Sequence, residues 1–187
     1  MLKKKSGFTL VEILIVIALT SILMGVMFTI YQNNNRSYII VTAKSDLYRA
    51  NLRTLDKIRG DIKKSSQLLA NYDTYSTSTN SIILQMPRLD VSQAPIVNTY
   101  NYVVYRLNPS NSRNLERIEI IDSVTTTQTL NQKVSSISFT PKDNLSNNIT
   151  ANIENTSQIA VVLVLSDISR NLAINSQLSS NETMRNK

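Results

Sequence analysis

The sequence predicts an α+β protein in which a long amino-terminal helix packs its second half against an antiparallel β-sheet head. Two observations support the helix: residues 13–31 carry no charged side chain, and residues 38–69 repeat apolar side chains at helical spacing. A third observation supports the sheet, because strand-like segments rich in β-branched and aromatic residues follow at 81–86, 99–107, 115–121, 134–140 and 159–165. The expected organisation is therefore a short leader at 1–7, a membrane-embedded half-helix at 8–31, an amphipathic half-helix at 32–70 and a head at 71–187.

The uncharged segment has the length of a membrane span. As a helix, residues 13–31 would rise about 28 Å, which matches the hydrocarbon core of a bilayer. Lys3, Lys4 and Lys5 precede it, and the flank that follows carries no charge until Arg36. The positive-inside rule then places residues 1–7 in the cytoplasm and the chain after about residue 32 outside, as a single-pass membrane protein.

The processing signal is unlike that of a secreted protein. A secretory signal ends in a small-x-small cleavage site after its apolar core, and residues 27–32 provide none. Gly7 is the small residue that could mark a cleavage site, and it lies on the cytoplasmic side of the apolar segment. Cleavage after Gly7 would remove the three lysines, leave the membrane helix on the mature chain and create a new α-amine on Phe8.

Glu12 directly precedes the uncharged segment and is the one carboxylate in the predicted membrane-embedded half-helix at 8–31. Insertion of such a group costs about 2.5–3.5 kcal/mol, so it needs a partner. The amine of Phe8, largely cationic at neutral pH, lies about one turn away in the same chain and could also come from a neighbouring subunit. A contact near 4 Å is worth about 4 kcal/mol at an effective dielectric of 20, comparable to the insertion cost. The alternative interpretation is a signal-anchor helix with an incidental glutamate near the cytoplasmic interface.

The lysine-rich leader, the run from Gly7 to Glu12 (G-F-T-L-V-E) and the apolar helix resemble the amino-terminal signature of type IV pilins and pseudopilins. The resemblance implies cleavage between Gly7 and Phe8 by a prepilin peptidase, which would also methylate the Phe8 amine. It implies that Glu12 pairs with a neighbouring subunit's amino terminus during assembly. The expected partners are other minor and major pilins, the peptidase, the membrane assembly platform and the lipid bilayer.

Composition narrows the function classes. The chain has no cysteine and no histidine, which excludes disulfides, metal sites built on those ligands and His- or Cys-based triads. We expect no enzyme activity, no metal and no cofactor. The formal charge of +7 becomes 7 − 3 = +4 once the leader lysines are removed, so part of the basic character reflects topology rather than a polyanionic partner.

The polar faces of the second half-helix suggest one further partner. Basic residues outnumber acidic ones between Lys44 and Lys64, so Lys63 and Lys64 could contact DNA or a partner subunit. No aromatic or glycine-rich binding pattern accompanies the charge, and a solvated face with i,i+3 and i,i+4 ion pairs is favoured over DNA contact.

A finer resemblance covers the second half of the chain. Its cues are, in order, Tyr105-Arg106-Leu107, Leu115-Glu116-Arg117, residues 134–139, the apolar segment 159–165 and Met184-Arg185-Asn186. This order is similar to that of W-type minor pilins and J-type minor pseudopilins. It implies a structural subunit that initiates or caps a type IV pilus or related filament at the cell surface. The alternatives are a pseudopilin of a secretion or DNA-uptake filament, and an anchored surface-binding module that never polymerises.

Overall fold

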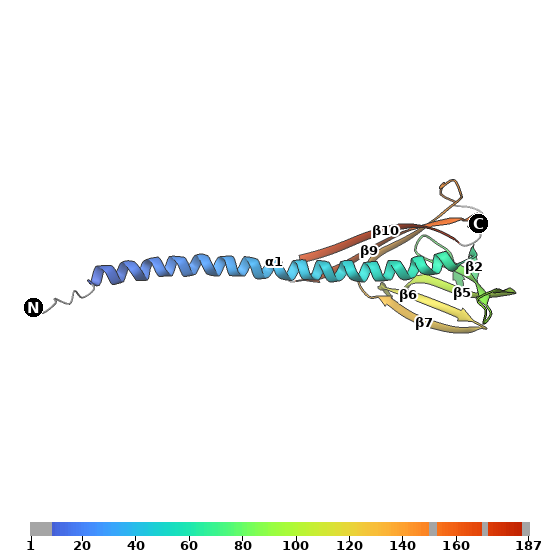
Figure 1. Cartoon of the computed structure of the whole chain (residues 1–187), viewed down its shortest axis with the longest axis horizontal. Helices are drawn as coiled ribbons and strands as arrows, with labels where there is room; N and C mark the ends of the chain where they lie inside the picture. The colour runs from blue at the N-terminus through green and yellow to red at the C-terminus, as the bar shows by residue number, and fades with distance from the viewer. Residues whose placement is uncertain (1–8, 150–152, 170–171, 185–187) are drawn as a thin grey trace, which may run out of the picture. The chain divides into compact units, whose positions relative to one another are not determined.

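The computed structural model describes residues 9–149, 153–169 and 172–184. The chain forms two compact units, an amino-terminal unit (Met1–Thr42) and a head unit (Ala43–Lys187). Helix α1 (Leu10–Lys64) begins in the first unit and ends in the second. The predicted α+β architecture, one long helix packed on antiparallel sheets, is confirmed (Figure 1).

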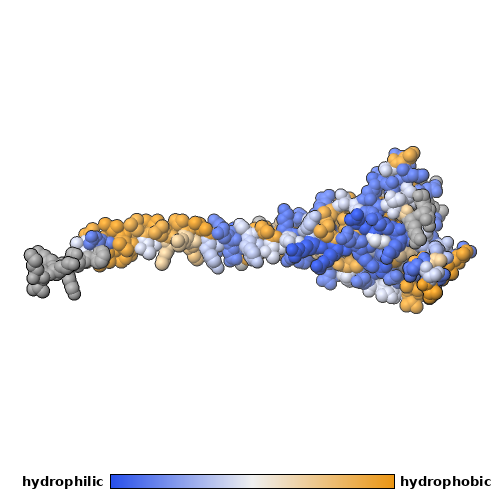
Figure 2. Space-filling view, in the orientation of Figure 1, coloured by the Kyte–Doolittle hydropathy of each residue, from blue (hydrophilic) through white to orange (hydrophobic). Residues whose placement is uncertain are grey.

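The amino-terminal unit is helical from Leu10, and its described side chains are exposed from Thr9 to Asn34. Its few polar side chains are satisfied locally, because the hydroxyls of Thr20, Ser21 and Thr29 donate to the carbonyl oxygen four residues earlier. Such back-bonding lets a small hydroxyl residue sit in an apolar environment without a buried polar group left unsatisfied. Figure 2 shows that the surface of this stretch is predominantly apolar.

The larger sheet of the head unit has five antiparallel strands in the order β1-β4-β5-β6-β7. These strands are β1 (Gln67–Leu69), β4 (Ile82–Leu89), β5 (Pro95–Asn108), β6 (Asn111–Ile121) and β7 (Val124–Asn131). Strands β4 to β7 follow one another as a meander, so the β4–β5 and β6–β7 turns lie at one end of the sheet and the β5–β6 turn at the other.

The smaller sheet has three antiparallel strands in the order β10-β9-β8. They are β8 (Val134–Lys142), β9 (Gln158–Ser169) and β10 (Leu172–Thr183), and a 3-10 turn, η1 (Ile153–Asn155), precedes β9. The apolar segment 159–165 lies in β9, which is the central strand. Its side chains alternate between buried (Ile159, Val161, Leu163) and half-buried, so this strand is not fully buried on both faces.

The core of the head unit forms where α1 meets both sheets. The buried helix residues Leu47, Leu55, Ile58 and Ile62 recur at helical spacing and face the strands. Asn51 fixes the helix to the smaller sheet, because its side-chain amide donates to the carbonyl oxygens of Leu163 and Ser176. The apolar stripe expected from the sequence is correct in part, since Val41 and Tyr48 are 67% and 48% exposed.

The helix ends earlier than expected. We predicted the amphipathic half-helix to extend to residue 70, but α1 stops at Lys64 and residues 67–69 form β1. Ser65 closes the last turn through hydrogen bonds to Asp61 and Ile62, and the Ser66 N–H donates to the Gln85 carbonyl instead of a helical one. Pairing with β4 therefore outweighs the helical periodicity of Gln67–Leu69.

The outer face of the five-stranded sheet has its own small core. Ile83, Val104, Ile118 and Ile120 are buried there beneath a short hairpin of β2 (Asn71–Tyr72) and β3 (Tyr75–Ser76). The Tyr72 ring stacks on Tyr102 with centroids 3.7 Å apart, and the Arg106 guanidinium lies 5.2 Å from the Tyr75 ring centroid. Both faces of this sheet are thus covered near its middle.

Candidate functional site

The start of α1 is a reciprocal capping box. Thr9 precedes the first helical residue, and the Glu12 N–H donates to the Thr9 hydroxyl at 3.3 Å. In return, the Thr9 N–H and hydroxyl donate to Oε2 of Glu12 at 2.8 and 3.0 Å. This arrangement satisfies donors at the helix start and places a carboxylate in the first turn, where the helix dipole favours negative charge.

Glu12 therefore has a local structural role that our sequence analysis missed. The signal was present, because a Thr followed three residues later by Glu at the head of an apolar run is a capping-box pattern. The predicted cleavage and methylation positions, Gly7 and Phe8, lie outside the described residues, as do Lys3, Lys4 and Lys5. Of the predicted processing and assembly residues, the structure describes Glu12.

The capped helix start leads directly into an exposed apolar surface. Within the described residues, α1 is the one helix with the length and composition to cross a membrane, and its most apolar window has no buried residue. Leu14, Ile17 and Met24 are examples, with exposed fractions of 57%, 58% and 68%. A surface of this size needs lipid or other helices to cover it.

The two lysines proposed as a partner contact lie in different environments. The Lys63 ammonium is 3.3 Å from Glu182, a buried carboxylate on β10 that also accepts a hydrogen bond from Arg59. Burial alone would raise the pKa of Glu182, but hydrogen bonds from Ser180, Arg59 and Lys63 hold it below its ordinary value. Lys64 is exposed at the end of α1. Lys63 thus joins α1 to β10, and the contact of Lys63 and Lys64 with DNA or a partner subunit stays a prediction.

A buried polar cluster joins α1 to the five-stranded sheet. Asp61 is 4% exposed, and its Oδ2 accepts hydrogen bonds from the Tyr105 hydroxyl and from Arg117, both at 2.6 Å. Arg117 also donates to Glu119 at 2.7 Å. Burial and the Asp61 carboxylate raise the pKa of the Tyr105 hydroxyl, so it stays protonated as a donor. Our sequence analysis missed this cluster, since Asp61 and Arg117 are 56 positions apart and nothing local marks them as partners.

Comparison with known proteins bears on the amino-terminal unit. A family model described as the prokaryotic N-terminal methylation motif matches residues 2–28. A search of curated proteins found no significant match to the chain.

The motif, the apolar helix and the antiparallel sheets together support a type IV pilin-like prepilin. Proteins of this class are substrates of pilus or pseudopilus assembly, are processed by a prepilin peptidase and assemble with other pilins. The chain is accordingly anchored in the membrane by its amino-terminal helix and then enters a filament at the cell surface. The motif suggests a structural role rather than an enzymatic one.

Proposed function

We propose that this protein is a minor subunit that initiates or caps a type IV pilus or a related filament. A prepilin peptidase cleaves between Gly7 and Phe8 and methylates the new Phe8 amine, and Glu12 then pairs with the amino terminus of a neighbouring subunit. The observation that carries the proposal is a single carboxylate, fixed in the first turn of a helix whose remaining membrane-length surface is apolar and exposed.

The capping geometry makes that pairing chemically reasonable. In the sequence, Phe8 directly precedes the capping residue Thr9, so cleavage after Gly7 would create the new amine one residue before the helix cap. Both bonds from Thr9 fall on Oε2 of Glu12, which leaves Oε1 to accept a bond from an incoming amine. Pairing between subunits neutralises both charges within lipid and couples assembly to burial of the apolar helix surfaces.

Support for the minor role comes from the head unit. The cues shared with W-type minor pilins and J-type minor pseudopilins include Tyr105 and Arg117, which both hold Asp61 of α1. Met184, another cue, directly follows β10 and is buried, whereas Arg185 and Asn186 lie outside the described residues. Adhesion or motility, protein secretion and DNA uptake remain three uses of such a filament.

A pair of substitutions separates assembly from helix capping. Glu12→Ala removes the carboxylate and the cap, whereas Thr9→Ala weakens the cap, by about 0.5–2 kcal/mol of helix stability, and keeps the carboxylate. We expect Glu12→Ala to abolish incorporation into filaments and Thr9→Ala to retain most of it, measured by immunoblot of sheared filaments against the membrane-retained pool. Equal incorporation by both variants would mean that Glu12 only caps the helix. A non-polymerising anchored module would be indifferent to either change.

Mass spectrometry of the protein from its own cells tests the processing directly. The mature chain should begin at Phe8 and carry a methyl group on that residue's amine. A chain that retains its first seven residues would contradict the proposed maturation.

A further inference from the structure

Part of the apolar stripe on α1 is not covered by the described residues. Tyr38, Val41 and Tyr48 are 70%, 67% and 48% exposed, and Ser45 between them is half-buried. We call these four residues the exposed seam. The same alternating steps of three and four residues continue along the helix to Leu55, which is buried. The stripe that the sequence predicted as one packing surface is therefore covered by the head unit only in its second part.

The exposed seam has the spacing of a helix-packing surface. Residues that recur at alternating steps of three and four return to one side of a helix, because their mean step of about 3.5 residues is close to one turn. Such a seam packs against a second helix by inserting each side chain between side chains of the partner. α1 is continuous through the seam, and the Thr42 hydroxyl donates to the Tyr38 carbonyl within it. The helix therefore presents a regular ridge that a second helix could cover.

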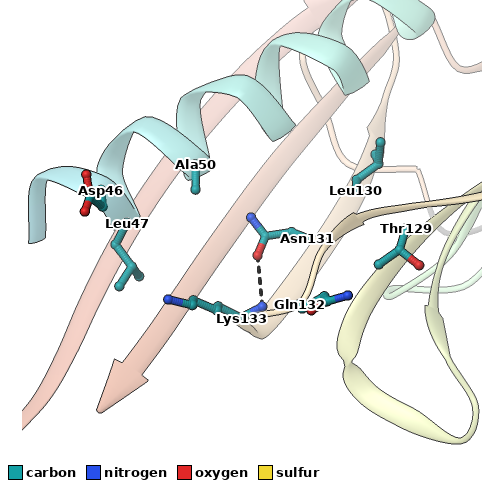
Figure 3. A pocket seen from close by; sticks show the side chains of 8 residues that line it. All are labelled: Asp46, Leu47, Ala50, Thr129, Leu130, Asn131, Gln132 and Lys133. Atoms are coloured by element: carbon teal, nitrogen blue, oxygen red, sulfur yellow. Dashed lines mark hydrogen bonds between the residues drawn. The ribbon is translucent and has the colours of Figure 1, made fainter. Parts of the chain in front are cut away.

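The head unit occupies a different face of the same helical turns. Leu47 and Ala50 line a cavity against the segment that connects β7 to β8 (Figure 3). The Asn51 amide donates to carbonyl oxygens of the smaller sheet. Since successive residues are about 100° apart, these three positions lie about 100° or more round the helix from the centre of the exposed seam. The packing of the head unit therefore leaves the seam free for another partner.

A bilayer does not reach the far end of the exposed seam. The predicted span ends at Tyr31, and Tyr48 follows it by 48 − 31 = 17 residues. At a rise of 1.5 Å per residue, the two positions lie about 26 Å apart along the helix. Lipid around residues 13–31 therefore leaves Tyr48 to be covered by protein.

The charged residues that flank the exposed seam are both basic. Lys44 lies about 80° to one side of the seam centre and Arg49 about 60° to the other, which are the flanking positions of a coiled-coil seam. Both are exposed, and neither forms a salt bridge among the described residues. Asp46 is the one acidic residue between Arg36 and Arg53, and it lies about 120° from the seam centre, beyond the flanking positions. The seam therefore has basic flanks on both sides.

These flanks make a second copy of this chain a poor partner for the seam. Subunits anchored with the same membrane orientation pack their helices in parallel. In a parallel pair with aligned seams, Lys44 of one copy would face Arg49 of the other, and the same contact would recur on the other side of the pair. Like charges at these positions disfavour pairing, whereas an Asp or Glu on the partner helix favours it.

We infer that the exposed seam docks against the helix of a different prepilin-like subunit, one that carries Asp or Glu beside its own apolar seam. The basic flanks disfavour a second copy and favour the acidic partner, which suits a subunit that is used once at a filament end and not repeated along the shaft. The seam is short, so it selects among subunits that the membrane helices already bring together. The inference rests on the proposed function, because filament assembly is what provides the neighbouring helices.

Charge reversal turns this chain into a probe for the partner. Lys44→Glu combined with Arg49→Glu gives an acidic-flank chain, and the chain with the natural residues is the basic-flank chain. Val41→Cys in both reports pairing, because the chain has no other cysteine and a disulfide forms only when the Cα atoms approach within about 7 Å. The two full-length chains, with different epitope tags, are co-expressed, and the membranes are treated with a mild oxidant. The matched control is Arg53→Glu combined with Lys57→Glu, the same change of charge at exposed positions on another face of α1.

We expect the mixed dimer of a basic-flank and an acidic-flank chain to exceed the dimer of two basic-flank chains by about tenfold or more, since both repulsive contacts become attractive. Pairing the basic-flank chain with the control reversal should give no more dimer than two basic-flank chains give. Equal yields of mixed and basic–basic dimers would overturn the inference, because the flanks would then not select the partner. A control reversal with the same effect would overturn it as well, since net charge alone would explain the result.

Incorporation into filaments distinguishes failure of this inference from failure of the proposed function. In its own cells, the acidic-flank chain without the cysteine should be depleted from sheared filaments by about tenfold or more, because its flanks repel an acidic partner. The control reversal should keep most of its incorporation. Equal incorporation of these two variants would overturn the seam inference and leave the filament role standing. Absence of the natural chain from filaments would contradict the proposed function, and the cross-linking yields would still decide whether the seam selects an acidic helix.

Discussion

The two ends of α1 have the same secondary structure and opposite surroundings. From Leu10 through residue 34 its described side chains are exposed, whereas from Leu47 to Ile62 one face is buried against two sheets. Residues 13–31 of the first stretch are apolar on all sides apart from three small hydroxyl residues, and the second stretch is apolar on one stripe with charges elsewhere. A helix that is hydrophobic on all sides must be buried by lipid or by other chains, whereas an amphipathic helix can bury its apolar face against the rest of its own chain.

Each of the two stretches contains a carboxylate, Asp61 or Glu12, and the two differ in where their hydrogen-bond partners come from. Asp61 is buried, and the chain itself provides its partners, Arg117 and Tyr105. Glu12 lies in an apolar segment, and its described hydrogen bonds come from Thr9 in its own turn, without a countercharge. The head unit balances its buried charge internally, and we propose that the amino-terminal unit balances its charge only when a second chain arrives.

The largest expected effect comes from removing the apolar stretch of α1 and keeping the head unit. A chain that begins at Ala43 should lose membrane association completely, as measured by flotation with lipid vesicles, because the whole apolar stretch is gone. Its free energy of unfolding in urea, followed by tyrosine fluorescence, should stay within about 1 kcal/mol of the full chain, since no buried core residue precedes Leu47 in the part of the chain that the structure describes. A loss of several kcal/mol would show that the apolar stretch also stabilises the head unit.

A smaller effect, confined to the head unit, is expected for Asp61→Ala. This change leaves the buried Arg117 without one of its two carboxylate partners and the Tyr105 hydroxyl without its acceptor. We expect a loss of about 3–5 kcal/mol in the free energy of unfolding. The matched control is Asp56→Ala on the same helix, where a 66% exposed side chain pairs with Arg59 and the loss should not exceed about 1 kcal/mol. Similar losses for both variants would mean that the buried cluster contributes no more than a surface ion pair.

The same contrast explains what the sequence predicted about the fold. Patterns that depend on local spacing were informative: the uncharged run gave the membrane-length helix, and β-branched segments located β4, β5, β6, β8 and β9. Strands β7 and β10 were missed because each is mostly Thr, Ser, Asn and Gln, with few apolar residues in alternation. They are strands because they pair with β6 and β9, a cause that lies outside their own residues.

The candidate site divides in the same way. Glu12 stands out in the sequence alone because it is a charged residue next to an apolar run, and with Thr9 it forms a pattern only four residues long. The Asp61–Tyr105–Arg117 cluster joins positions that are tens of residues apart, and so does the cavity that Leu47 of α1 and Leu130 of β7 line (Figure 3), so no local spacing reveals either of them. The exposed apolar residues of the head unit were overlooked for another reason: an exposed valine such as Val91 and a buried one such as Val103 are the same residue type, and only the fold distinguishes them.

The smallest expected effect is on the stability of the head unit, and it depends on pH. Glu182→Gln keeps the shape and a hydrogen-bond acceptor for Arg59 but removes the charge that faces Arg59 and Lys63. At pH 7 we expect the head unit to lose about 1–2 kcal/mol, measured by urea unfolding of the parent and the variant. Because the folded-state pKa of Glu182 lies below its ordinary value of 4.5, the parent's advantage is fully present above that value and is lost as the pH falls through the folded-state pKa. The two unfolding curves should therefore converge in acid, and a difference that persists unchanged there would assign the loss to packing rather than to charge.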